Sequence, residues 1–511
     1  MTVTSLASRR YTILQDLSFA TLGFSGIPQD TRLMFKTFAT MDSVKVTGLL
    51  SEMTGGHSTS ISTKLHLSRP ALDYLEASRF MMSATGLPVK PGPRFLARPR
   101  RLLSRAGRAL SSYDTRPVPR GLYDDTIWRT YFQKTLGSSD RALVAAQDFR
   151  LTNFNTGIVN DRLRLPIFNA PHLKTDGFDF FVTSDPRPIR TSPGTTLILR
   201  YHDPIPLTHP DTMENPDAVR FHFLQIERSQ PLGYFVCNSK ATEEALIDIF
   251  PSLKPRATTI PYALPDAPPP PARAIPVEEI IRTRLSSASL EDEKQPTTVQ
   301  KSILQRARLD KPFRYIMWLT SLEPKKNTAG VIRAWERVKY THAPDLKLVL
   351  VGKPAWRYQE ILKAIRPRFL EGELLHVEDL PFVEIQSLYR NAECFVFPSF
   401  AEGFGFPPME ALQCGTPSVV SDIPAHRWVM QDAVLYADPY DDAQVAEQIR
   451  RLVIADDRKD LRAKLIANGQ RVLKRYEPQR VGEQWQELFS RLKRDGVLAH
   501  PAEIPEAAHA G

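Results

Sequence analysis

The chain has 511 residues, more than one hydrophobic core usually serves, so two domains are expected. Its composition is that of a globular protein, with 42% hydrophobic and 24% charged residues. The net charge of +10 favours anionic partners, namely sugar nucleotides, phospholipid surfaces or nucleic acid, and charge alone does not choose among them.

Targeting signals and cysteine motifs are sparse in this sequence. The start, MTVTSLASRR, is followed by no apolar stretch of signal-peptide length, and no window approaches about 18 uninterrupted apolar residues. The three cysteines lie far apart and form no Cys-x-x-Cys motif, so no disulfide is expected. We therefore predict a cytoplasmic protein.

The first predicted element is a strand from Tyr11 to Phe19, followed by the loop TLGFSGIPQD and a helix from about Thr31 to Met41. In α/β domains, a loop between a strand and a helix places backbone donors near a ligand. We therefore predict that Gly26 lies in a loop over a binding cleft. An ordinary tight turn between strand and helix is the alternative.

A basic segment follows, because no acidic residue occurs between Glu76 and Asp114. Its part Arg94–Arg108 has an amphipathic pattern that can lie on an anionic membrane surface. This predicts a peripheral location on the inner face of the plasma membrane. A solvated helix that caps the N-terminal domain is the alternative, and the lack of interleaved aromatic residues argues against nucleic acid.

Two apolar strands lie between Phe178 and Asp203, in FDFFVT and TTLILRYHD. Polar residues just after a buried parallel strand lie at the carboxyl edge of the sheet, where α/β proteins bind ligands. His202 and Asp203 are therefore candidates for a ligand site. The next strand, in GYFVCNSK, leads into a helix that Ser239 caps.

Proline and polar residues dominate the middle of the chain, from Pro265 to Pro271 and from Ser286 to Thr298. These compositions resist compact packing, so residues 265–311 are predicted to be an interdomain linker with a helix near Val277–Leu285. Beyond the linker, the strands in FRYIMWL, LKLVLVGKP and LLHVEDL alternate with helices. This alternation predicts right-handed βαβ units and a parallel sheet.

The most informative stretch is FVFPSFAEGFGFPPMEALQCGTPSVVSD, from Phe395 to Asp422. It predicts a buried strand, a glycine-bearing loop, a short helix opened by Pro407 and Pro408, and a second strand. Gly415 supplies the left-handed residue that ends the helix. The helix N-terminus then points free N–H donors at the loop before it, which predicts a phosphate site.

Two carboxylates frame this predicted phosphate site, Glu402 in the loop and Glu410 in the helix. Each can accept hydrogen bonds from a pair of adjacent hydroxyls, as on a ribose or a hexose. A phosphate between two groups that bind diols indicates a sugar nucleotide. The alternative is that the glutamate only complements the helix dipole and the Gly-x-Gly only makes a tight turn.

The ordered run PSFAEGFGFPPMEALQCGTPSVVSD resembles the Glu-x7-Glu signature of the retaining glycosyltransferases of family 4. The resemblance implies an α/β fold called GT-B, with two Rossmann-like parallel-sheet domains that face a cleft and a C-terminal helix that crosses back to the first domain. The implied boundaries are an N-terminal acceptor-binding domain at 1–264 with a basic insert near 77–120, the linker at 265–311, a nucleotide-sugar domain at 312–478, a crossover helix at 479–493, and a disordered tail at 494–511. The helices before the tail are predicted at Asp441–Ile454 and Arg458–Leu492.

The same resemblance implies the roles of the donor residues. Glu402 would bind hydroxyls of the transferred sugar and Glu410 the ribose. The backbone of Gly403, Phe404, Gly405 and Phe406 would face the donor sugar and its diphosphate. EPKKN is similar to the family's Glu-Pro-Arg-Lys-Asn, which assigns the diphosphate to Lys326, and the loop ending at Leu380 would offer its backbone to the base.

On the acceptor side, YHDPIPLTHP resembles the family's His-Asp turn. This would place His202 beside the reacting centre, with Asp203 and Gly26 in the acceptor and cleft loops. The sequence departs from the family pattern at Leu319, where glycine is usual, and at Trp428, where an acidic residue is frequent.

The implied reaction is transfer of a hexose, mannose-like and from GDP-mannose, to a hydroxyl of a glycan or lipid-linked glycan in surface polysaccharide assembly. Retention of the anomeric configuration is expected. No metal or other cofactor is expected, because the sequence holds no Asp-x-Asp triplet and Lys326 would neutralise the phosphates. The alternatives are a non-catalytic partner protein of the same fold and a synthase or phosphorylase that uses a sugar phosphate.

Overall fold

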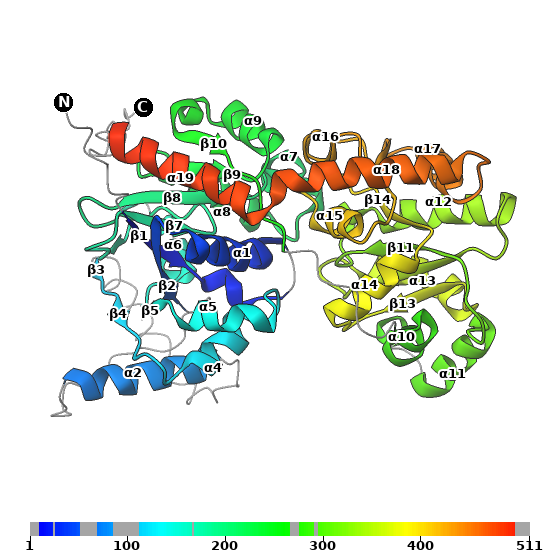
Figure 1. Cartoon of the computed structure of the whole chain (residues 1–511), viewed down its shortest axis with the longest axis horizontal. Coiled ribbons are helices and arrows are strands. Elements are labelled where there is room, and N and C mark those ends of the chain that lie inside the picture. The colour runs from blue at the N-terminus through cyan, green and yellow to red at the C-terminus, as the bar shows by residue number, and fades with distance from the viewer. Residues whose placement is uncertain are drawn as a thin grey trace. The chain divides into compact units, whose positions relative to one another are not determined.

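The computed structural model describes residues 10–23, 26–51, 69–84, 112–165, 168–265, 275–290 and 295–495. The chain divides into two compact units, each with its own parallel sheet (Figure 1). Unit 1 comprises Met1–Asp203, Val219–Pro265 and Tyr476–Gly511, and unit 2 comprises Pro204–Ala218 and Asp266–Arg475. The predicted membrane-binding segment Arg94–Arg108 and the predicted tail beyond residue 495 lie outside the described residues.

Unit 1 is built on an eight-stranded sheet in the order β10-β9-β8-β7-β1-β2-β5-β4. All neighbours are parallel except β4 and β5. The central strand β7 is buried along its whole length, as expected for a strand covered on both faces. The strands are β1 (Tyr11–Asp16), β2 (Val44–Leu50), β4 (Arg116–Pro117), β5 (Asp148–Leu151), β7 (Phe180–Thr183), β8 (Thr196–Tyr201), β9 (Gly233–Cys237) and β10 (Ala257–Thr259), with a separate pair β3 (Ser112–Tyr113) and β6 (His172–Leu173).

The position of α1 shows that the prediction for Gly26 is wrong. Gly26 is the first residue of α1 and does not lie in an open loop, because Pro28 is tolerated in a first helical turn and the helix starts well before Thr31. The helices are α1 (Gly26–Thr40), α2 (Arg69–Ala84), α4 (Asp124–Ile127), α5 (Arg141–Ala145), α6 (Thr156–Leu163), α8 (Pro216–Ser229), α9 (Lys240–Ile249) and α19 (Pro478–Asp495).

The last helix, α19, packs on unit 1, which confirms that the C-terminal helix returns to the first domain (Figure 1). The ring of Phe489 lies 4.7 Å from that of Phe180, and the ring of Trp485 lies 5.2 Å from that of Phe38. The prediction of a single helix from Arg458 is wrong, because one helix ends at Leu473 and α19 begins at Pro478. Proline lacks the N–H that a continuing helix needs and is accepted in the first turn of a new one.

Unit 2 is built on a six-stranded sheet in the order β13-β12-β11-β14-β15-β16, with every pair parallel. The strands are β11 (Tyr315–Leu319), β12 (Lys347–Val351), β13 (Leu374–Val377), β14 (Cys394–Phe397), β15 (Ser418–Ser421) and β16 (Leu435–Ala437). The helices are α7 (Ile205–Thr208), α10 (Val277–Arg284), α11 (Pro296–Ala307), α12 (Thr328–Thr341), α13 (Gln359–Leu370), α14 (Phe382–Asn391), α15 (Phe406–Gln413), α16 (Pro424–Met430), α17 (Asp442–Val453) and α18 (Arg458–Leu473). Two units with parallel sheets confirm the predicted α/β class.

The segment predicted as a linker is largely part of unit 2. Leu290 and Ile303, which lie in it, are buried in the hydrophobic core of this unit, and Leu285 forms a bridge with Val377 at the sheet edge. The prediction failed because it rested on the average composition of a polar segment. A few apolar residues at the right positions are enough for the segment to pack.

The chain also leaves unit 1 briefly after β8. Residues 204–218 belong to unit 2, where the indole Nε1 of Trp356 donates to the Thr212 carbonyl at 3.0 Å. Arg357 donates to the Asp211 carbonyl at 2.7 Å. The predicted N-terminal domain at 1–264 therefore differs from unit 1 in this segment.

Candidate functional site

The loop between β14 and α15 has the geometry of a helix-terminal anion site. Gly405 is the N-cap of α15 and adopts a left-handed conformation with φ of +92°, which favours glycine. The prolines of the first turn start the helix, and Gly415, with φ of +73°, follows its end as the sequence predicts. Pro407 and Pro408 carry no N–H, so what this end of the helix offers an anion is mainly the positive end of its dipole.

Lys326 and Glu402, predicted to act on the diphosphate and the sugar, lie together in unit 2. Lys326 Nζ is 2.5 Å from Glu402 Oε1, and the two side chains are only 11% and 10% exposed. Glu323, the first residue of the EPKKN motif, lies 3.9 Å from the same ammonium. One lysine thus faces two carboxylates in a nearly dry environment.

Asn327 folds the EPKKN motif into this position. It adopts a left-handed conformation, ends the short turn Pro324–Lys326 and caps α12 by accepting from the Gly330 N–H at 3.2 Å. Its amide donates to the Pro398 carbonyl at 3.2 Å, in the loop after β14. The asparagine therefore fixes the lysine turn against the loop that carries Glu402.

The pKa values of the two glutamates shift in opposite directions because their surroundings differ. Burial alone would raise the pKa of Glu402, but Lys326, Lys325 and His426 together lower it below its ordinary value. Burial raises the pKa of Glu323, against the lowering effect of both lysines. Glu402 is therefore ionised at neutral pH, and it is the main counter-ion of Lys326.

The other predicted donor residues occupy the same unit. Glu410 lies in α15 and is 9% exposed, with Tyr389 Oη 3.5 Å from its Oε2. Leu380 is half-buried in the connection between β13 and α14. The backbone of Gly403–Phe406 runs directly into the start of α15.

Sequence reasoning missed His426, which is fully buried in α16. Burial lowers its pKa to about 4, with Lys326 adding to the shift and Glu402 opposing it, so the ring is neutral at neutral pH. The signal that could have found it is its place just after β15, since a histidine at the carboxyl edge of a strand was the reason for selecting His202.

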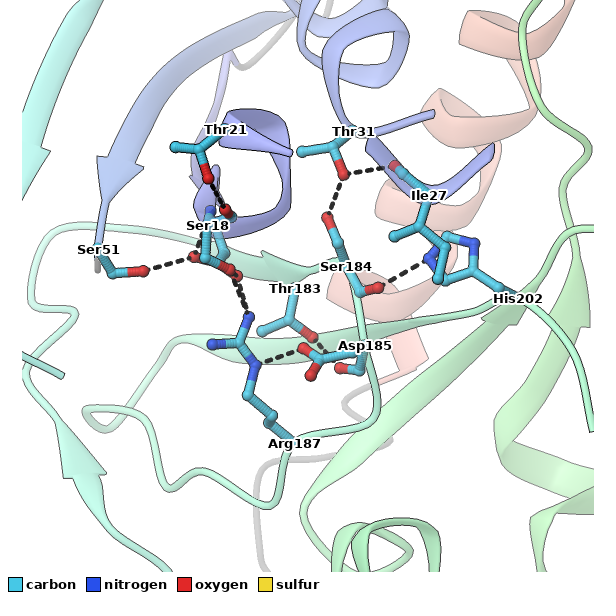
Figure 2. A network of polar contacts seen from close by, with 11 residues as sticks. Ser18, Thr21, Ile27, Thr31, Ser51, Thr183, Ser184, Asp185, Arg187 and His202 are labelled. Carbon is cyan, nitrogen blue, oxygen red and sulfur yellow. Dashed lines mark hydrogen bonds and ion pairs between the residues drawn. The ribbon is translucent and has the colours of Figure 1, made fainter. Parts of the chain in front are cut away.

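The predicted acceptor-side residues belong to unit 1. His202 Nε2 donates to the Ser184 carbonyl at 2.7 Å, and Ser184 Oγ lies 2.8 Å from Thr31 Oγ1 (Figure 2). His202 Nδ1 is 2.6 Å from Tyr262 Oη, so both ring nitrogens have partners. Burial, with Arg200 nearby, lowers the pKa of His202 to about 3 despite the bond to Ser184. The role of His202 on the sugar stays a prediction, as does that of Asp203 just after β8.

A buried ionic network lies at the carboxyl ends of β1 and β7 and was not predicted. Arg187 pairs with Asp185 through Nε and with Asp16 through Nη2 of its guanidinium. Ser18 and Ser51 also donate to Asp16, at 2.7 and 3.3 Å, and Figure 2 shows both serines converging on this point. Neighbouring β1 and β7 mark where the strand order changes direction, which is the usual ligand position in such sheets.

The described ranges contain neither a metal-binding cluster nor a helix suited to cross a membrane. Among these residues, no group of three or more His, Cys, Asp or Glu side chains could hold a metal ion. Within the same part of the chain, no helix has the length and hydropathy needed to cross a membrane.

The two parallel-sheet units define the class of fold, which is GT-B, the fold of many glycosyltransferases. Solved structures agree: Staphylococcus aureus TarM has a TM-score of 0.54 at 12% identity, over 94% of this chain and 99% of that one. Anabaena HepE, solved in complex with UDP-glucose, has a TM-score of 0.51 at 14% identity, over 94% of this chain and 100% of that one. These likenesses show the fold.

One part of the chain matches a known protein family in sequence. Residues 299–472 match the protein family described as Glycosyl transferases group 1. The O-antigen chain mannosyltransferase B of Escherichia coli is 28% identical over 186 residues, which is 36% of this chain and 48% of that protein. The O-antigen chain mannosyltransferase RfbU of Salmonella typhimurium is 36% identical over 83 residues, or 16% and 24% of the two chains.

These matches span about half or less of the length of the two relatives. Lys326, Glu402, Glu410 and His426 fall within the matched residues 299–472, whereas His202 does not. The sequence similarity to glycosyltransferases therefore covers the donor-side candidates of unit 2.

Proposed function

We propose that this protein is a retaining glycosyltransferase of family 4 that transfers a hexose from a nucleoside diphosphate to a hydroxyl of a glycan or lipid-linked glycan. The observation that carries the proposal is the buried pair of Lys326 with Glu402, a residue of the loop before the N-terminus of α15. It lies within the residues that match the glycosyltransferase family. An ammonium and a helix N-terminus attract a diphosphate, while a carboxylate beside them accepts from sugar hydroxyls.

In this proposal, Lys326 and the positive end of the α15 dipole stabilise the charge that grows on the diphosphate as the glycosidic bond breaks. Glu402 orients the hexose through its hydroxyls, and Glu410 binds the ribose. The acceptor hydroxyl attacks from the face that the diphosphate leaves, and phosphate oxygens take its proton, so the anomeric configuration is retained. Lys326 already pairs with Glu402 at 2.5 Å, so the donor meets an ammonium whose position is fixed in advance.

We favour a mannose-like sugar and GDP-mannose as the donor, because the two relatives described above are named mannosyltransferases of O-antigen chains. The same names support a place in surface polysaccharide assembly. We also propose that the reaction needs no metal ion, since Lys326 takes the neutralising role at the phosphates.

A thermal-shift panel tests this proposal. The ligands are GDP-mannose, GDP, UDP-glucose and UDP, each with and without EDTA. A ligand at about a hundred times its dissociation constant adds about 2.7 kcal/mol to the free energy of unfolding, enough to raise the melting temperature measurably. We expect a shift with GDP and GDP-mannose that survives EDTA, and NMR of the product to show a retained configuration. A folded protein that responds to none of the four ligands would contradict the proposal.

A further inference from the structure

The ring of His426 has one nitrogen in use and one without a partner. Its Nδ1 lies 3.1 Å from the Ser421 carbonyl oxygen and 3.1 Å from Ser421 Oγ. A carbonyl oxygen only accepts, so the bond to it requires the proton on Nδ1. The Nε2 atom of a neutral ring is then a hydrogen-bond acceptor, and it is buried without a partner in the described structure.

The unpartnered Nε2 faces the start of α15. A Cβ atom added to Gly405 would lie 3.1 Å from this nitrogen, so the ring packs closely against the N-cap of the helix. The ring also packs against Phe397, with 5.9 Å between the two ring centroids, and Lys326 Nζ lies 5.3 Å from the same Phe397 ring. His426 thus lies close to the Lys326–Glu402 pair, with the Phe397 ring in contact with both His426 and Lys326.

An unpartnered acceptor in a buried position costs stability, and folded proteins keep few of them. Apolar residues of similar size would fill this position without that cost. The structure therefore keeps the lone pair of Nε2 at the N-terminal end of α15, where the proposed donor sugar would lie. A sugar supplies O–H groups that can donate to it.

We propose that His426 determines donor specificity by accepting a hydrogen bond at Nε2 from a hydroxyl of the bound hexose, while Ser421 holds the ring in the required tautomer. This inference rests on the proposed function and extends it to a residue outside the Glu-x7-Glu motif. The nucleoside diphosphate does not need this contact, because its phosphates and ribose are assigned to Lys326, the start of α15 and Glu410.

Three substitutions separate this role from simple packing. His426→Asn can keep a polar group near Nδ1 and removes the one near Nε2, whereas His426→Gln can restore an amide near Nε2. His426→Phe keeps the ring and removes both nitrogens. Val429→Ala, in the same helix and equally buried, is the matched control for loosened packing.

The measurement is the affinity of each variant for GDP-mannose and for GDP, by titration calorimetry, with UDP-glucose and UDP as the second pair. We expect His426→Asn and His426→Phe to weaken binding of the sugar nucleotide about fivefold to tenfold while the affinity for the diphosphate changes less than twofold. His426→Gln should restore most of the loss, and Val429→Ala should leave the ratio of the two affinities unchanged.

A parallel loss of both affinities in His426→Asn, or no loss in either, would overturn the role of His426 while leaving the proposed function intact. Failure of the wild-type protein to bind any of the four nucleotides would instead contradict the proposed function. Deoxy analogues of the donor sugar complete the test. The hydroxyl that His426 binds should matter to the wild type and not to His426→Phe.

Discussion

Two buried ionic clusters in this protein differ in how completely their polar atoms are paired. In unit 1, Arg187 lies between Asp16 and Asp185, and serine hydroxyls donate to Asp16 as well. In unit 2, Lys326 pairs with Glu402, but Glu323 Oε2 and His426 Nε2 nearby have no partner among the described residues.

The difference indicates different tasks for the two clusters. A buried charge must be paired if it only holds loops together, because an unpaired charge in a low dielectric is costly. A site that receives a ligand keeps polar atoms for groups that arrive later, and it accepts a loss of stability for them. We therefore interpret the Arg187 cluster as a connection between β1 and the loop after β7, and the Lys326 cluster as a binding site.

The largest effect is expected when the ionic connection in unit 1 is broken. Arg187→Ala leaves two carboxylates buried without a cation, so the free energy of unfolding should fall by about 3–5 kcal/mol in urea titrations. Arg129→Ala is the matched control, since Arg129 pairs with Asp125 at the surface and should contribute about 0–1 kcal/mol. A loss in Arg187→Ala no larger than in the control would show that the cluster does not stabilise the fold.

The second prediction concerns removal of the Glu402 charge from the Lys326 cluster. Glu402→Gln keeps the shape of the side chain and leaves Glu323 3.9 Å from Lys326, so the melting temperature should fall less than in Arg187→Ala, while the transfer rate falls on the order of a hundredfold. Glu447→Gln, which affects only a surface pair with Arg450, should leave the rate unchanged. Full activity in Glu402→Gln would remove this residue from the site.

Lys326→Met should affect folding less than Arg187→Ala, because Lys325 stays 3.7 Å from Glu323, and its main effect should be on binding. The substitution removes the ammonium and keeps most of the aliphatic stem, so GDP affinity should fall about tenfold, as expected for a lost charge-assisted contact. Titration calorimetry measures this directly, and unchanged nucleotide affinity would refute the role assigned to Lys326.

The last prediction concerns the pH dependence of stability through Asp185. Burial raises the pKa of Asp185 to about 6, with Arg187 opposing the shift and Asp16 adding to it. Since an unfolded aspartate titrates near about 4, the folded protein holds an extra proton between about pH 4 and 6. Raising the pH through this window should therefore lower the free energy of unfolding, by about 1.4 kcal/mol for each unit between the two pKa values.

His202 and His426 have lowered pKa values, so they change the free energy of unfolding with pH in the opposite direction. The effect of Asp185 is therefore measured by comparing the wild type with Asp185→Asn. The difference between their melting temperatures from pH 4 to 7 isolates Asp185. A difference that stays constant with pH would contradict the shifted pKa.

The sequence alone determined the parts of this protein that depend on neighbours in the chain. The strand, loop and helix around Glu402 follow from an apolar run, two prolines and two glycines whose backbone needs are local, and the structure has α15 and Gly415 as predicted. The alternation of strands and helices likewise predicted parallel sheets, and the structure has them.

Only the tertiary structure decided which distant groups share a buried site. Lys326 and Glu402 are 76 positions apart, and Asp16 and Arg187 are 171 positions apart, so no local pattern relates them. The same reason explains the misjudged linker, where Leu290 and Ile303 find their core partners far along the chain. His426 escaped notice because its neutral state and its unpartnered nitrogen arise from burial, which depends on everything that packs around the ring.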